Sequence, residues 1–158
     1  MGLTLEGPVE LVIFVLEGQQ YALPLRDAEH VLPMVAVSPV PRAPEIALGL
    51  INFHGKVVPV LDIRHRLGLP PREYGPDAYL LVALTSRRTV ALPVDEVLGV
   101  REVQAGAVTR PDAVLPGIDQ IAGIVTLSKG LLFIHDLNAF LSLDEEKQLT
   151  AALQEIAR

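Results

Sequence analysis

The apolar residues of this chain come in short runs cut by glycine, proline or charge, and this spacing constrains the fold more than any other feature. Leu11–Leu16 and Tyr21–Leu25 flank the polar segment Glu17–Gln20, which carries a glycine. Two apolar runs of strand length joined by a glycine-bearing turn are typical of a β-hairpin. Further hairpins are predicted at residues 49–63, 79–94 and 123–137. The pattern therefore predicts a mainly β chain.

The sequence of the four predicted hairpins indicates two copies of one repeated unit. The matching elements are Ala22–Leu25 with Ala91–Val94, and Gly49–Asp62 with Gly123–Asp136. Each half is too small to be more than marginally stable alone, so we expect the halves to share a hydrophobic seam. Duplicated small barrels are favoured over one large sheet.

The whole chain, residues 1–158, is predicted to form one domain of two barrel lobes. First-repeat elements span about residues 9–70 and second-repeat elements about 77–141, with exchange of strands between the lobes left open. Residues 142–158 are predicted to form a C-terminal helix, because Ser142 and Glu145 have capping-box spacing. One apolar stripe follows at helical spacing: Leu149, Ala152, Leu153 and Ile156.

Composition excludes several classes of protein. The net charge is −6 and aromatic residues are 4%, which disfavours a nucleic-acid binder, and the absence of cysteine excludes disulfides. The longest clean apolar run, Tyr79–Leu84, is too short to cross a membrane, and the N-terminus lacks a signal-peptide pattern. We therefore expect a cytoplasmic protein without direct membrane insertion. Half of the residues are hydrophobic, so we expect strands buried on both faces or surfaces that partners cover.

The sequence gives little sign of reaction chemistry. The pairs Asp62 with His65 and His135 with Asp136 have no third ligand nearby in sequence, so no metal site is expected. Nucleophile-elbow and phosphate-loop motifs are absent, so no catalytic residue, no cofactor and no enzymatic activity are expected. The two aspartates are expected to accept backbone amides at strand ends. Structural turn or close-approach roles are predicted for Gly49, Gly55 and Gly123.

A family resemblance emerges from the central segment. Pro39-Val40-Pro41, followed by Gly49–Arg64, resembles the signature of CheW-like coupling proteins of bacterial chemotaxis. That family reads Pro-x-Pro, then Gly-hydrophobic-hydrophobic-Asn-x-Arg-Gly, then a Val-Pro-hydrophobic-hydrophobic-Asp strand. The likeness spans about Val9 to Leu141. It implies two SH3-like five-stranded β-barrel lobes packed side by side.

The resemblance also implies a function and partners. It implies a non-enzymatic scaffold that joins the cytoplasmic tips of methyl-accepting chemotaxis receptors to the regulatory domain of a CheA-type histidine kinase, within a two-component system. Such a protein is cytoplasmic and reaches membrane receptor arrays through its partners. The positions that match the family's receptor-binding groove are Leu25, Ala28, His30, Val31, Asn52, His54, Val94 and Val97.

Two residues depart from the family pattern. His54 stands where the family usually has Arg before the turn glycine, and His30 stands where many members have Glu. If these positions face each other, two histidines replace an ion pair. This favours the hypothesis of a scaffold for a divergent receptor or pathway, such as twitching motility or surface sensing. The remaining alternatives are an unrelated small-barrel interaction module and a binder of small molecules or metals in the groove between lobes.

Overall fold

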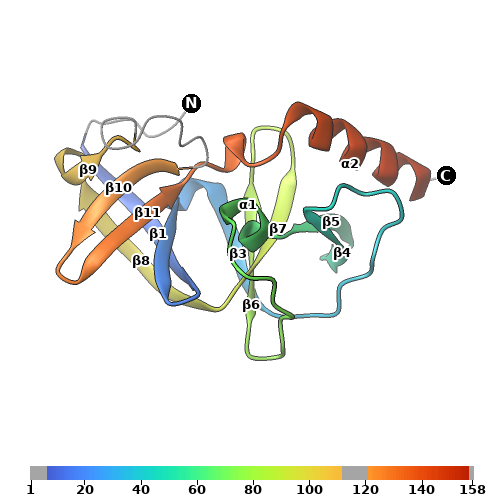
Figure 1. Ribbon diagram of the computed structural model, residues 1–158, viewed down its shortest axis with the longest axis horizontal. Coiled ribbons are helices and arrows are strands. Elements are labelled where there is room, and N and C mark those ends of the chain that lie inside the picture. Colours follow the sequence, from blue (N-terminus) through green and yellow to red (C-terminus); the bar gives the residue numbers. More distant parts are fainter. Residues whose placement is uncertain (1–6, 112–120, 157–158) are drawn as a thin grey trace.

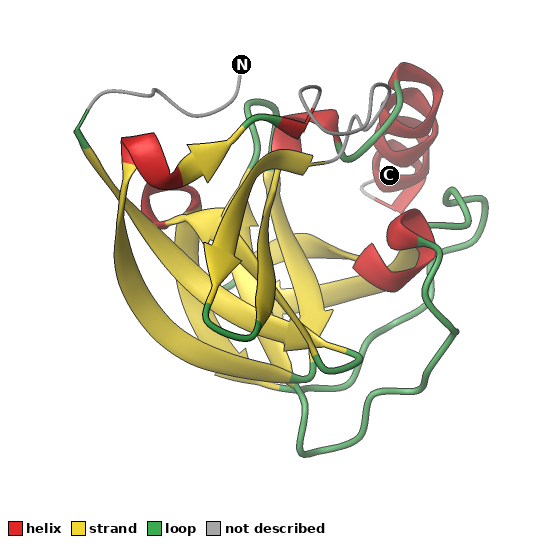
Figure 2. Cartoon of the chain, turned by 60° about the vertical axis from the view of Figure 1, so that its left-hand side comes forward, coloured by secondary structure: helices red, strands yellow, loops and turns green. Residues whose placement is uncertain are grey.

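The computed structural model describes residues 7–111 and 121–156 and is built around two β-sheets (Figures 1 and 2). The N-terminal segment tested for a signal peptide and the last two residues of the predicted helix lie outside this range. The first sheet has the order β8-β1-β2-β11-β10-β9 and the second β3-β6-β7-β5-β4. The strands of the first sheet are β1 (Pro8–Leu16), β2 (Gln19–Pro24), β8 (Glu96–Gln104), β9 (Val108–Thr109), β10 (Ile121–Leu127) and β11 (Gly130–His135). Those of the second are β3 (Ala28–Pro33), β4 (Ala47–Phe53), β5 (Lys56–Leu61), β6 (Tyr79–Leu84) and β7 (Thr89–Val94).

All four predicted hairpins are confirmed as antiparallel pairs: β1–β2, β4–β5, β6–β7 and β10–β11. The first two turn through a non-glycine residue and a glycine that both have positive φ, Glu17-Gly18 and His54-Gly55. Two successive positive φ angles define the turn whose twist matches that of a hairpin. Gly55 therefore has the turn role predicted for it. By contrast, Gly49 and Gly123 lie within β4 and β10, each beside a register shift rather than in a turn.

The two sheets repeat one arrangement, in which the halves of the chain exchange strands. In each sheet a central hairpin pairs in parallel with a second hairpin, through β2 and β11 or through β7 and β5. The strand on the other side of the central hairpin comes from the other half of the chain. Thus β8 follows β7 in sequence but pairs with β1, and β3 follows β2 but pairs with β6. Separating the halves would therefore break both sheets.

Three apolar clusters form the core. The largest lies between the sheets and includes Phe14 of β1, Leu92 of β7 and Leu149 of the C-terminal helix. A second cluster lines the first sheet, with Leu11 and Ile134, and a third lines the second sheet, with Phe53 and Val82. Alternate residues of β1 belong to two different clusters, because successive side chains of a strand point to opposite faces. The expected shared hydrophobic seam is the largest of the three.

The helices complete the central cluster. The helix α2 (Leu143–Ile156) starts at the predicted capping box, in which Glu145 N donates to Ser142 Oγ at 3.1 Å and Ser142 N to Glu145 Oε1 at 2.9 Å. Its buried Leu149 and Ala152 pack inward, and Figure 1 shows the helix running beside the second sheet. Other helical segments within the described residues are α1 (Ile63–Leu67), η1 (Leu25–Asp27), η2 (Ala105–Ala107) and η4 (Leu137–Ala139). The described chain is mostly strands in two sheets and ends with a helix, so the predicted fold class is confirmed. The first sheet differs from five strands by the short additional strand β9. Within the described residues, no helix is long and apolar enough to cross a membrane.

His135, the last residue of β11, is a buried polar group without a described hydrogen-bond partner. Its side chain is 1% exposed, and neither ring nitrogen bonds to a described residue. The Phe140 ring lies 5.4 Å away, centroid to centroid. Burial, assisted by the charge of Arg66, lowers the pKa of His135 to about 4. The folded protein therefore holds this imidazole in its neutral form.

This burial predicts a loss of stability in mild acid. Between about pH 6.5 and 4 the unfolded chain binds a proton that folded His135 does not, so the free energy of unfolding falls as the pH falls. The loss amounts to at most about 3 kcal/mol. Urea unfolding across this range should show a shallower pH dependence for His135→Leu than for the wild type, while the matched change His65→Gln at an exposed histidine should not alter the slope. Equal slopes for wild type and His135→Leu would contradict a buried neutral imidazole.

Candidate functional site

A buried ion cluster centred on Arg64 joins the two sheets. Arg64 lies in α1, which is capped by Asp62 through a hydrogen bond from Arg64 N to Asp62 Oδ1 of 3.1 Å. The Arg64 guanidinium is fully buried and donates from Nη2 to both carboxylate oxygens of Asp95, at 2.9 and 2.8 Å. Its Nη1 pairs with Glu17. The β1–β2 turn, α1 and the β7–β8 corner thus meet at one cation.

Backbone contacts reinforce this joint. Glu17 N donates to Asp95 Oδ2 at 2.9 Å, and Asp95 N donates to Val15 O at 3.0 Å. Burial disfavours the charged form of Arg64, but its hydrogen bonds with Glu17 and Asp95 outweigh this and raise its pKa. Burial also raises the pKa of Tyr74, whose ring lies beneath the guanidinium, to about 12. Arg72 adds a second cation, with Nη1 3.4 Å from Asp95 Oδ1, so two arginines face the two carboxylates. These contacts link the β1–β2 turn of the first sheet to the end of β7 in the second.

The structure brings His30 and His54 together, as the sequence hypothesis required. Their ring centroids lie 5.8 Å apart, and both rings pack edge-on against Phe53, at 5.2 and 4.4 Å. His30 lies on β3 and His54 in the β4–β5 turn. Asn52 shapes that turn, since its Oδ1 accepts a 2.8 Å hydrogen bond from Gly55 N. Phe53, which sequence reasoning did not select, contacts both imidazole rings.

Val31 lies next to His30 but projects to the other face of β3. His30 is opposite Val82, which belongs to the cluster inside the second sheet. Val31 is opposite Leu81, which belongs to the cluster between the sheets. Residues directly opposite each other in an antiparallel pair share a face. The predicted receptor-binding residues therefore fall on both faces of the edge strand β3.

The other predicted positions differ in their access to solvent. Leu25, Ala28 and Val97 are half-buried at the rim of the central cluster. Val94 has no exposed surface and belongs to that cluster, so its prediction as a receptor-binding residue is corrected to a core role. Every side chain of β7 is buried, because β7 lies between β6 and β5 and is covered on both faces.

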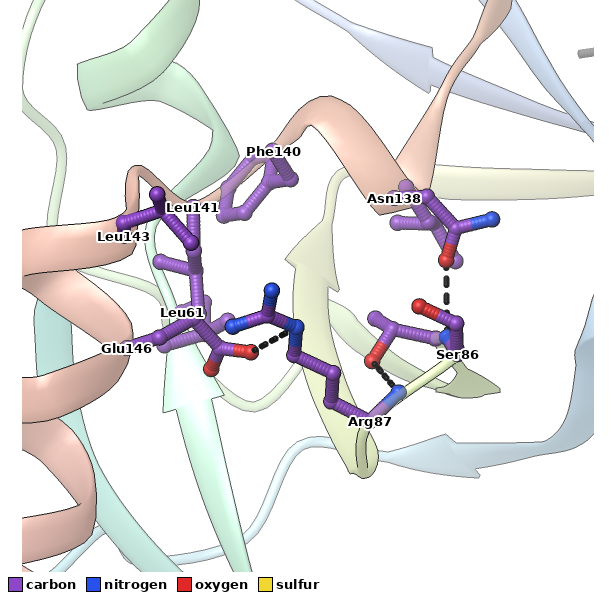
Figure 3. Close-up of a pocket in the computed structure, with 10 residues that line it drawn as sticks. Leu61, Ser86, Arg87, Asn138, Phe140, Leu141, Leu143 and Glu146 are labelled. Carbon is purple, nitrogen blue, oxygen red and sulfur yellow. Dashed lines mark hydrogen bonds and ion pairs between the residues drawn. The ribbon is translucent and has the colours of Figure 1, made fainter. Parts of the chain in front are cut away.

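Figure 3 shows a pocket of about 230 Å³ between the β6–β7 turn and the start of α2. Some of its polar groups contact each other: Ser86 N donates to Asn138 Oδ1 at 2.7 Å, and Arg87 pairs with Glu146, which also pairs with the neighbouring Arg88. These contacts tie the β6–β7 turn to η4 and α2. We therefore assign the pocket a structural role.

The aspartates that close β5 and β11 cap the helical segments that follow. Asp62 caps α1, and Asp136 Oδ1 accepts a 3.0 Å hydrogen bond from Asn138 N at the start of η4. These equivalent caps confirm the predicted role as acceptors of backbone amides at strand ends. Among residues 7–111 and 121–156, no group of three or more His, Cys, Asp or Glu side chains could hold a metal ion.

The described residues thus form two sheets joined by an ion cluster, with β3 at one sheet edge and no reaction centre identified among them. Comparison with known proteins identifies the group: the CheW-like domain family matches residues 10–145, and the chain belongs to this family. The chain is 29% identical over 144 residues to the chemotaxis protein CheW of Bacillus subtilis, covering 90% of this chain and 91% of that protein. It is 26% identical over 147 residues to the protein FrzA of Myxococcus xanthus, covering 90% of each. The crystal structure of the scaffolding protein TtCheW from Thermoanaerobacter tengcongensis matches with a TM-score of 0.79 at 25% identity, covering 87% of this chain and 95% of that one.

Proposed function

We infer that the protein is a coupling adaptor of bacterial chemotaxis, and we propose that it joins a CheA-type histidine kinase to the cytoplasmic tips of methyl-accepting receptors. The family match across residues 10–145 carries this proposal. The similarity to TtCheW, which is a scaffolding protein, supports a role without catalysis. The protein would then work in the cytoplasm and reach receptor arrays through its partners.

The receptor tip is proposed to dock along the edge strand β3. Among the described residues β3 forms a ladder with β6 alone, and its residues His30 and Val31 are exposed, although the rings of Phe53 and His54 lie against His30. Val31 is 44% exposed on one face, beside the half-buried Leu25 and Ala28 at the rim of the central cluster. His30 lies on the other face of β3, beside His54 of the turn that Asn52 shapes. A helical tip whose apolar ridge packs along this edge would contact both groups.

Substitution of Val31 tests this surface. In Val31→Asp a charge would be buried at the interface, so we expect affinity for a receptor tip fragment to fall about tenfold or more, with affinity for the kinase regulatory domain unchanged. Isothermal titration with each partner measures both values. Leu131→Asp is the matched control, because Leu131 is 42% exposed but lies on β11 of the other sheet. Equal receptor affinity in the two variants would exclude the β3 edge as the docking surface.

Two observations favour a second candidate, an adaptor for a divergent pathway. The chain is similar to FrzA as well as to CheW proteins, and paired histidines stand at the two positions where the family usually has Arg and Glu. An imidazole pair does not offer the permanent charge and fork of donors of an arginine. We expect weak binding to a receptor tip of the usual kind, and stronger binding after the double change His30→Glu/His54→Arg. Ordinary affinity that the double change does not alter would contradict this candidate.

A further inference from the structure

His30 and His54 lie where the two edges of the second sheet approach each other. Its strand order places β3 and β4 at opposite edges. The His30 ring on β3 nevertheless lies 5.2 Å from Phe53 at the end of β4 and 5.8 Å from His54 in the following turn, centroid to centroid. These ring contacts therefore join two edges that no backbone ladder connects.

The surrounding structure holds both rings in place. Both pack against Phe53, at interplanar angles of 62° and 82°. The backbone of His54 has φ 51°, and the turn is fixed by the hydrogen bond between Gly55 N and Asn52 Oδ1. Both imidazoles are exposed, so an ion can reach them from solvent. The neighbouring cation of the turn, Lys56, is engaged elsewhere, because its Nζ donates to Thr89 Oγ1 at 2.9 Å.

The separation of the rings matches that of two imidazoles bound to one metal ion. A zinc–nitrogen bond is about 2.0–2.1 Å long, which places the metal about 3.2 Å from the centroid of each ligating ring. Two such rings have centroids about 5.2 Å apart at a tetrahedral angle and up to about 6.4 Å apart at wider angles. The observed separation of 5.8 Å lies in this range.

We propose that His30 and His54 form a two-imidazole site for a divalent transition metal ion of the Zn²⁺, Ni²⁺ or Cu²⁺ class. Imidazole suits these ions, and water or a side chain of a docked partner would fill the remaining coordination positions. The sequence analysis predicted no metal site in the chain and kept metal binding only as an alternative; the sequence could not show this pair, because the two histidines are 24 positions apart. The proposal does not depend on receptor binding.

Metal-dependent thermal stability tests the site. A metal that binds the folded chain between the edges formed by β3 and β4 raises the melting temperature. The rise is proportional to the logarithm of the metal concentration once the site is saturated. We expect this rise for the untagged full-length chain with ZnSO₄ or NiSO₄, and its loss in His30→Gln and in His54→Asn. Asn is chosen at position 54 because it tolerates positive φ and keeps the turn. His65→Gln, at an exposed histidine on α1, should retain the full shift.

A second measurement separates metal binding from a general stabilisation of the contact between the β3 and β4 edges. Titration calorimetry with Zn²⁺ should give one ion per wild-type chain and at least about tenfold weaker binding for either single variant, because each removes one of two ligands. The double variant His30→Glu/His54→Arg can join the β3 and β4 edges with an ion pair but lacks both imidazoles. It should therefore melt cooperatively, and NiSO₄ should not raise its melting temperature. Two results would overturn the proposal. One is that the metal does not raise the melting temperature of the wild type. The other is that His30→Gln and His54→Asn show the same rise as the wild type.

Discussion

An Arg64→Met variant is expected to lose about 3–5 kcal/mol of the free energy of unfolding. The substitution removes two charge-assisted hydrogen bonds from Asp95, whose side chain is 17% exposed, and leaves it the bond from Glu17 N and a 3.4 Å contact with Arg72. It also leaves the Glu17 carboxylate without its partner at the β1–β2 turn. Breaking one member of a buried ion cluster costs more than the cluster contributes, because a largely buried carboxylate, here that of Asp95, loses its main partner. Urea unfolding at neutral pH measures the loss.

Two matched variants make this result specific. Arg42→Met removes an arginine whose side chain is 78% exposed and pairs with Glu155, so its free energy of unfolding should change little. Arg64→Met/Asp95→Leu should recover part of the loss seen in Arg64→Met, because the unpaired carboxylate is gone. A loss in Arg64→Met as small as that in Arg42→Met would show that the cluster does not hold the sheets together.

A Gly49→Ala variant is expected to lose about 3 kcal/mol or more. A Cβ at position 49 would lie 2.2 Å from the backbone oxygen of Ser38 and 2.8 Å from a Val37 side-chain carbon. The Ser38 backbone cannot retreat freely, because Ser38 N and O form hydrogen bonds with Leu50 of 2.9 and 2.8 Å. The clash therefore has to move β4 or the segment that covers its edge.

Gly75→Ala is the control for this second prediction. An added Cβ at Gly75 meets no atom within 4 Å, and the residue lacks a positive φ, so stability should be nearly unchanged. Thermal and urea unfolding of both variants measure the difference. If Gly49→Ala were as stable as Gly75→Ala, the close approach of Ser38 to β4 would be wrong.

The hairpins were predictable because their determinants are local. Each needs two apolar runs and a short turn, in which glycine permits positive φ at Gly18 and Gly55 and the Thr85 hydroxyl binds the backbone at the glycine-free β6–β7 turn. These signals lie within about fifteen residues. The capping box at Ser142 is local in the same way. The exchange of β3 and β8 between sheets depends on pairing with strands more than forty residues away, as in Val31 with Leu81, and no short motif encodes it.

The candidate site was predictable only in part, for the same reason. The family resemblance selected His30 and His54, and their departure from the usual pair raised the question of contact that the structure answers. Val94 was misassigned because an apolar residue at a strand end has the same pattern in a groove and in a core. Arg64 was not singled out, although an arginine three residues after a buried strand was a signal. Its partners Glu17 and Asp95 lie far away in the sequence.

The central claim is that one chain holds a kinase and a receptor at the same time. The most direct test immobilises the regulatory domain of a CheA-type kinase and measures retention of a receptor tip fragment with and without this protein. We predict that the fragment is retained only when the protein is present, that Val31→Asp abolishes this retention, and that Leu131→Asp preserves it. Failure of the folded wild-type protein to retain the fragment, whether or not it binds the kinase domain alone, would contradict the proposed coupling.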